Sequence, residues 1–207
     1  MAWAPRLLMS PGNPVLTLAA LETGSIAAGI EALDALLKEA PVSILLAEAA
    51  SPGKYLVLFT GEVEELSRSL AKAIEVAGDE RIDDVLLPAP EADLVKAMIS
   101  PSAIPVEDRE PPAIGVLETW TAPTLLAAAD SALKTGQTGL CQVHLLSGIG
   151  GKSTAILHGD IASTRVAISA GAEVAREREA LAREVLIPRP DANLLDCLDP
   201  SRRNTSQ

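Results

Sequence analysis

Aromatic side chains make up only 2% of this 207-residue chain, which excludes the stacking platforms of proteins that bind single-stranded nucleic acid. The net charge is −11 and no run of Lys or Arg occurs, so neither nucleic acid nor an anionic membrane is expected as a partner. No apolar run reaches the ~20 residues that span a bilayer, and the N-terminus lacks the pattern of a signal peptide. The two cysteines, Cys141 and Cys197, lie far apart, which favours buried thiols in a cytosolic protein over a disulfide or a metal site.

A long internal repeat is the most prominent feature that the sequence does contain. Leu21-Glu22-Thr23 recurs as Leu117-Glu118-Thr119, and Gly53-Lys54 recurs as Gly151-Lys152. The offset between the copies grows from 96 to 100 residues, which indicates small insertions in the second copy, expected in loops. Each copy is long enough to bury its own core, so the repeat predicts two tandem domains and favours a pseudo-symmetric assembly.

The hydrophobic pattern predicts the same order of elements in both copies. In the first copy we expect strands at 15–21, 42–47, 55–60 and 82–87, and helices at 24–38, 62–77 and 91–98. The order βαββαβ, followed by a short terminal helix, predicts an α+β fold with helices over one face of a four-stranded, largely antiparallel sheet. The domains are expected at 15–100 and 113–200, with a linker rich in Pro and charge at 101–112.

A glycine-rich segment in the second copy, Gly148–Thr154, is similar to a nucleotide phosphate loop but departs from it in two ways. Leu146 stands where that motif needs its first glycine, and the residues after Lys152 have the pattern of a strand rather than a helix. A tight glycine-rich turn is therefore the favoured interpretation.

Titratable residues do not form a recognisable active site. The two histidines, His144 and His158, have no Cys or carboxylate at a metal-ligand spacing. Glu22 and Glu118 end equivalent strands, and their duplication favours a structural contact, such as a helix cap or a salt bridge, over catalysis. The sequence predicts a binding or structural role rather than an enzyme.

Several motifs, each in the right order in both copies, resemble bacterial microcompartment shell domains. They are the Leu-Glu-Thr strand, the Asp-x-x-x-Lys helix end, the glycine-rich loop before the third strand, the Gly-Asp helix start (Gly-Glu in the first copy) and Ile-Pro-Arg-Pro (Leu-Pro-Ala-Pro in the first copy). The match covers about 18–98 and 113–198. Two non-permuted copies in one chain are similar to the tandem-domain, trimeric class of these shell proteins, above all to those of propanediol-utilisation compartments.

This resemblance implies a homotrimer that forms a pseudohexameric tile, builds a selectively permeable wall around enzymes in the bacterial cytoplasm, and contacts other shell proteins (hexamers and pentamers). It implies a central pore for small polar metabolites. The expected pore-lining residues are Ser51, Pro52, Gly53, Gly148, Ile149, Gly150 and Gly151. The expected tile-edge contacts are Lys38, Lys134 and Arg189.

One residue departs from the resembling family. In the propanediol proteins a cysteine just before Pro-Gly-Lys, contributed by three chains, holds an iron–sulfur cluster, whereas this chain has Ser51 there. A hydroxyl is a poor replacement for a thiolate at iron, so no cluster, metal or other cofactor is expected. The alternative to a shell tile is a soluble trimer that binds a ligand or carries electrons outside any shell.

Overall fold

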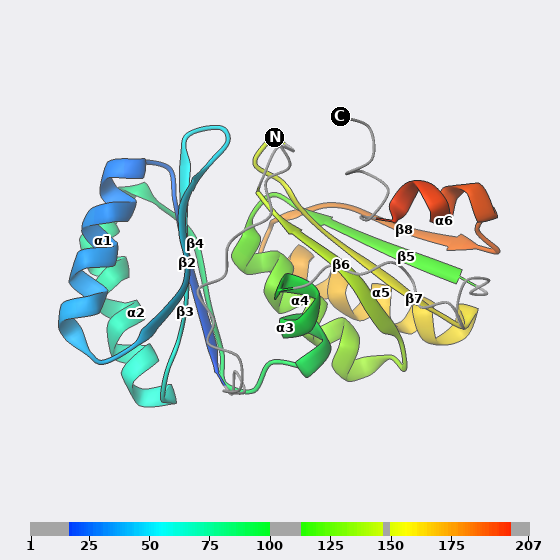
Figure 1. Ribbon diagram of the computed structural model, residues 1–207, viewed down its shortest axis with the longest axis horizontal. Coiled ribbons are helices and arrows are strands. Elements are labelled where there is room, and N and C mark those ends of the chain that lie inside the picture. Colours follow the sequence, from blue (N-terminus) through cyan, green and yellow to red (C-terminus); the bar gives the residue numbers. More distant parts are fainter. Residues whose placement is uncertain (1–16, 100–112, 147–149, 200–207) are drawn as a thin grey trace.

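Each half of the chain folds into a four-stranded antiparallel sheet with two helices on one face (Figure 1). The computed structural model describes residues 17–99, 113–146 and 150–199. The first domain contains β1 Leu18–Thr23, α1 Ile26–Glu39, β2 Ser43–Ala50, β3 Lys54–Thr60, α2 Val63–Ala77, the 3-10 turn η1 Gly78–Glu80, β4 Arg81–Leu87 and α3 Ala92–Ile99. The second contains β5 Ala113–Thr119, α4 Ala122–Thr135, β6 Gly139–Leu145, β7 Ser153–Gly159, α5 Ile161–Glu177, β8 Leu181–Pro188 and α6 Ala192–Leu198.

The strand order is the same in both sheets, β2-β3-β1-β4 and β6-β7-β5-β8. The register is also the same: Glu22 lies opposite Asp83, and Glu118 lies opposite Arg183 at the equivalent place. The predicted α+β fold with tandem, non-permuted domains is therefore confirmed. The expected linker, 101–112, lies outside the described residues.

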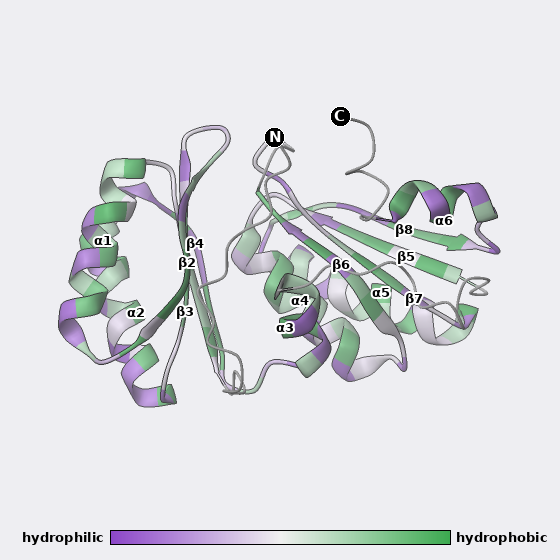
Figure 2. Ribbon diagram, viewed as in Figure 1, coloured by the Kyte–Doolittle hydropathy of each residue, from purple (hydrophilic) through white to green (hydrophobic). Residues whose placement is uncertain are grey.

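The inner face of each sheet packs on its own helices because alternate strand residues are apolar. In the first domain this core includes Ala19, Leu21, Val57 and Phe59 from the sheet, with Leu36 of α1 and Leu66 of α2. In the second domain Gly115 leaves room for Ile168 of α5, since a Cβ there would lie 2.4 Å from Ile168 Cγ1. Figure 2 shows this mainly apolar character along the strands of both sheets.

The outer face of the first sheet is buried as well, because the second domain packs against it (Figure 1). Helix α4 lies on β4 and β1, and α3 extends from the first domain to lie beside α4 on β6. One apolar cluster therefore runs through both domains, with Leu18, Leu56, Leu58 and Val85 from the first sheet and Ala122, Leu125, Leu126 and Ala129 from α4.

Candidate assembly surfaces and pore loops

The turn between β2 and β3 lies directly against the loop between β6 and β7. A Cβ on Gly151 would lie 2.8 Å from Pro52 Cδ and 3.1 Å from the Ser51 carbonyl oxygen, so only glycine fits there. Lys54 Nζ donates to the carbonyl oxygens of Gly151 and Trp120, both at 3.0 Å. The structure thus brings Ser51, Pro52 and Gly151 together.

Gly53, at the tip of the turn between β2 and β3, is open within the single chain. Nothing lies within 4 Å of a Cβ placed there, so close packing does not explain this glycine. Its φ of +85° does, because other residues rarely adopt that conformation. Gly150 has a φ of +68° and is likewise open, while the expected sites Gly148 and Ile149 lie outside the described residues.

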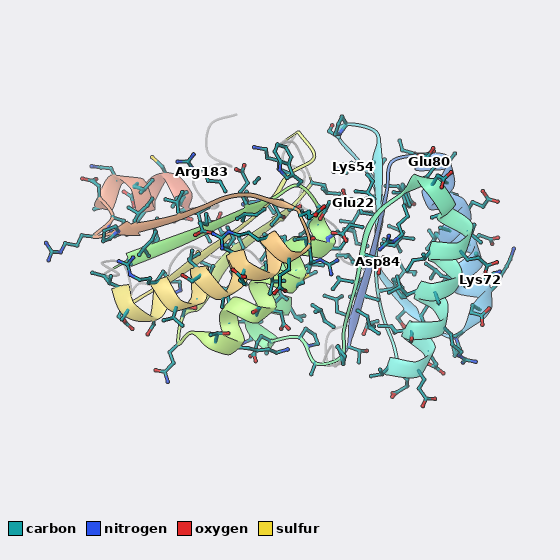
Figure 3. The ribbon with its side chains drawn as sticks, turned by 180° about the vertical axis from the view of Figure 1, so that it is seen from behind. Glu22, Lys54, Lys72, Glu80, Asp84 and Arg183 are labelled. Carbon is teal, nitrogen blue, oxygen red and sulfur yellow. The ribbon has the colours of Figure 1, made fainter. Side chains whose placement is uncertain are left out.

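Glu22 is fully buried at the boundary between the domains, next to Lys54 (Figure 3). Glu22 Oε1 lies 2.7 Å from Lys54 Nζ, and Glu22 Oε2 accepts from the backbone N–H of Ala122 at 2.7 Å. Burial raises the pKa of Glu22, against the opposing effect of Lys54. The carboxylate therefore serves as both salt-bridge partner and helix cap, which confirms the structural role predicted for it.

The equivalent pair in the second domain, Glu118 and Lys152, is more open. Glu118 Oε1 lies 3.3 Å from Lys152 Nζ, and 29% of the Glu118 side chain is exposed, against none for Glu22. Lys152 Nζ also lies 4.7 Å from the ring centroid of Trp120, which is itself half exposed. Two nearly identical pairs thus differ because only one is covered by a following domain.

Asp83 is a second carboxylate that binds the start of α4, and no pattern in the sequence pointed to it. It accepts from the backbone N–H of Thr124 at 3.1 Å, from the Thr124 hydroxyl at 2.7 Å and from the Thr121 hydroxyl at 2.5 Å. Arg178 Nη2 donates to Asp83 at 2.7 Å and to the Asp84 carbonyl oxygen at 2.5 Å. An anion at a helix N-terminus is favourable, so Asp83 ties the two domains together.

The expected edge residue Lys134 also lies at this boundary. Its Nζ donates to the Ala89 carbonyl oxygen at 2.8 Å and to Asp130 at 2.6 Å. Lys38, the equivalent residue of the first domain, pairs with Asp34 and leaves 73% of its side chain exposed. Arg189, equivalent to Ala89, is exposed and has a φ of +49°.

Helix α1 presents a row of large apolar side chains to solvent. Ile26, Ile30 and Leu37 are 40%, 53% and 48% exposed, because α1 packs on its own sheet through Gly29, Ala32 and Leu36 instead. The residues of α4 at the corresponding positions, Ala122, Leu126 and Leu133, lie against or near the first sheet, and the first two are fully buried. Helix α1 therefore carries a second apolar face without a cover in the single chain.

The outer face of the second sheet is the matching uncovered surface. Val116, Thr154 and Val185 are partly exposed there, whereas their equivalents Ala20, Leu56 and Val85 are buried under α4. Helix α6 covers one end of this face, where Leu194, Leu195 and Leu198 pack on Ile114, Cys141 and Ile156. In Figure 1, α6 lies on the side of the sheet opposite α4 and α5.

Comparison with known proteins gives the family. The model of the BMC domain matches twice, at residues 17–90 and 113–190. The chain belongs to the bacterial microcompartment shell family. It is 35% identical over 174 residues to the bacterial microcompartment shell protein PduT of Citrobacter freundii, covering 84% of this chain and 92% of that one.

Two further relatives agree with this membership. A crystal structure of a microcompartment protein from Desulfitobacterium hafniense DCB aligns with a TM-score of 0.74 at 38% identity, covering 87% of this chain and 98% of that one. The carboxysome assembly protein CcmO of Synechococcus elongatus is 28% identical over 85% of this chain and 66% of its own length. The chain is thus a structural shell protein rather than an enzyme, as the sequence predicted.

No group of three or more His, Cys, Asp or Glu that could hold a metal occurs in 17–99, 113–146 and 150–199. Within the same residues, no helix is long and apolar enough to cross a membrane. Cys141 is buried, donates to the Ile156 carbonyl oxygen at 3.2 Å, and has its pKa raised to about 12 by burial, while Cys197 is exposed on α6.

Proposed function

We propose that this shell protein closes into a homotrimer whose six domains form one tile of a microcompartment wall in the bacterial cytoplasm. The observation that carries the proposal is the pair of complementary uncovered surfaces, the apolar face of α1 and the outer face of the second sheet. They correspond to α4 and the first sheet, which already pack together inside the chain. Repeating that contact between chains uses one head-to-tail interface, which forms a ring when it closes.

In this ring the contacts of the first junction recur between chains. Glu118 would accept from the N–H of Ile26 in the next chain, as Glu22 accepts from Ala122. Lys152 would donate to the Gly53 carbonyl oxygen of the next chain, as Lys54 donates to Gly151. Both side chains are partly exposed and so are available for this interface.

Closure also requires α6 to move. Helix α3, its equivalent, leaves its own sheet and packs on β6 of the following domain. Helix α6 lies over Ile114 and Ile156, whose equivalents Leu18 and Leu58 are covered by the second domain in the other copy. In the trimer α6 would therefore pack on β2 of the next chain, where Ile44 and Ala47 are only partly buried.

The six loops that meet at the axis would form the pore. Ser51, Pro52 and Gly53, with Gly148, Ile149, Gly150 and Gly151, supply hydroxyl, backbone and small apolar groups but no charge. The nearby Lys54 is neutralised by Glu22. Such an opening favours small polar metabolites over bulky apolar ones.

An iron–sulfur cluster does not fit these residues. Ser51 supplies a hydroxyl rather than a thiolate, and the cysteines lie elsewhere, on β6 and α6. Changing Ser51 to Cys is the direct test. Anaerobic reconstitution with iron and sulfide should colour the S51C trimer and leave the parent colourless, and a parent that purifies with stoichiometric iron would contradict the cluster-free pore.

The tile would join its neighbours, other shell proteins, through Lys38, Lys134 and Arg189, and it would enclose enzymes. A planar guanidinium such as that of Arg189 can donate to several carbonyl oxygens of an adjacent tile. Electron microscopy of concentrated protein should show sheets for the parent and single trimers for R189A. A parent that stays as free trimers at every concentration, alone and with shell partners, would favour the alternative, a soluble carrier.

A further inference from the structure

The two junctions of the proposed ring carry opposite charges at the same place. Asp83 lies opposite Glu22 in the first sheet, and Arg183 lies opposite Glu118 at the equivalent position in the second. Both follow a register shift next to the end of the first strand, so the equivalence is fixed by strand pairing and not by similarity of sequence. This reversal of charge concerns the residue that faces the following helix.

Inside the chain the sheet supplies the negative partner. Asp83 binds the start of α4 and pairs with Arg178 at 2.7 Å, which follows the last residue of α5. Arg178 also donates to the Thr124 hydroxyl through Nε at 3.0 Å. The cation of this pair therefore comes from the following domain.

On the two uncovered surfaces, the outer face of the second sheet and α1, the signs of the charges are reversed. Arg183 is exposed and makes no ion pair with the described residues of its own chain. The residue equivalent to Arg178 is Gly78, since each follows the last residue of its helix, and Gly78 begins the exposed, acidic turn Gly78-Asp79-Glu80. Glu80 Oε2 would lie 3.3 Å from a Cβ on Gly24, so this carboxylate lies beside the start of α1.

Figure 3 shows that Arg183 and Glu80 belong to different domains and lie far apart within one chain, whereas Glu22 and Lys54 meet at the internal junction. Arg183 and Glu80 can meet only if a second chain follows the first. An arginine brought to the start of α1 is unfavourable for the helix dipole unless a carboxylate balances it, and Glu80 supplies that carboxylate.

We propose that Arg183 of one chain pairs with Glu80 of the next, and that this ion pair stabilises the junction between chains. This inference rests on the proposed ring. The first sheet and α4 already cover each other inside the chain, so the second sheet and α1 are the surfaces left for the next chain. Opposite charges that face each other across this junction favour the contact.

The test is a charge exchange in the full-length chain, read by native mass spectrometry over a dilution series. R183E and E80R should each raise the trimer dissociation constant by roughly tenfold or more, because each brings like charges together. The double variant R183E/E80R should return it to within about threefold of the parent, since it restores an ion pair of opposite polarity. The single variants should also lose their defect as salt is raised.

K72E is the matched control, because it makes the same change of charge on α2, where Lys72 pairs only with exposed Glu75. It should leave the dissociation constant unchanged. A parent that is not a trimer would overturn the ring itself. A trimeric parent with unaffected single variants, or with a double variant no better than either, would overturn only the Arg183–Glu80 pair.

Discussion

Lys54 compensates the most deeply buried carboxylate at the junction. Replacing it with Met would leave Glu22 without a cation in a fully buried place, and breaking a buried pair in this way costs about 3–5 kcal/mol. We expect K54M to lower the free energy of unfolding by that amount in urea. K96M is the control, because Lys96 and Asp93 are both largely exposed and water screens such a pair. Equal effects of the two variants would contradict the buried role of Lys54.

Glu48 on β2 gives a dependence on pH. Burial raises its pKa from 4.5 to about 7, so the folded state resists the charged form. Below about pH 4.5 the Glu48 carboxyl is protonated in both the folded and the unfolded state, and it does not lower the free energy of unfolding. As the pH rises to about 7, the unfolded state loses the proton first, and the free energy of unfolding falls. E48Q should therefore match the parent in urea unfolding near about pH 4 and exceed it near about pH 8. Glu173, an exposed residue paired with Arg176, supplies the control E173Q. A gain for E173Q as large as that for E48Q would assign the effect to net charge instead.

The helices α3 and α6 are equivalent in sequence but pack differently. Leu94 of α3 is fully buried against the second domain, so L94A should lower the free energy of unfolding by about 2–5 kcal/mol. Leu194 of α6 is only partly buried on its own sheet. If α6 moves to the next chain on closure, L194A should act chiefly on the trimer and raise its dissociation constant roughly fivefold or more. Native mass spectrometry separates the two effects, and an unchanged trimer for L194A would show that α6 stays on its own sheet.

The sequence predicted the elements but not how one helix is used. The spacing of Ile26, Ile30, Leu33 and Leu37 indicates one apolar face of α1. The side that packs on its own sheet is instead lined by Gly29, Ala32 and Leu36. When a helix has two apolar faces, the periodicity of its apolar residues does not reveal which face packs against its own domain. The structural role of Glu22 could be predicted because the repeat marked it. Asp83 and Lys134 could not, because their partners across the junction depend on how the domains are arranged.

One substitution on the exposed apolar face of α1 tests whether this face forms the interface of the proposed ring. I30D would place a charge in the centre of the proposed interface, where Leu126 is fully buried in the internal copy. We expect I30D to remain folded by circular dichroism and to be monomeric. V166D is the control, because Val166 on α5 is similarly exposed, at 49%. Helix α4 packs extensively on the first sheet, whereas α5 does not. Trimers of I30D as stable as those of V166D would remove α1 from the interface.

The number of chains in the assembled parent protein is the most direct test of the proposed ring. Native mass spectrometry of the full-length chain, of 21.5 kDa, should give a single assembly of three chains that persists on dilution. That result follows if the contact between α4 and the first sheet is repeated between α1 and the second sheet until the ring closes. A stable monomer, or an assembly of six chains, would contradict the account.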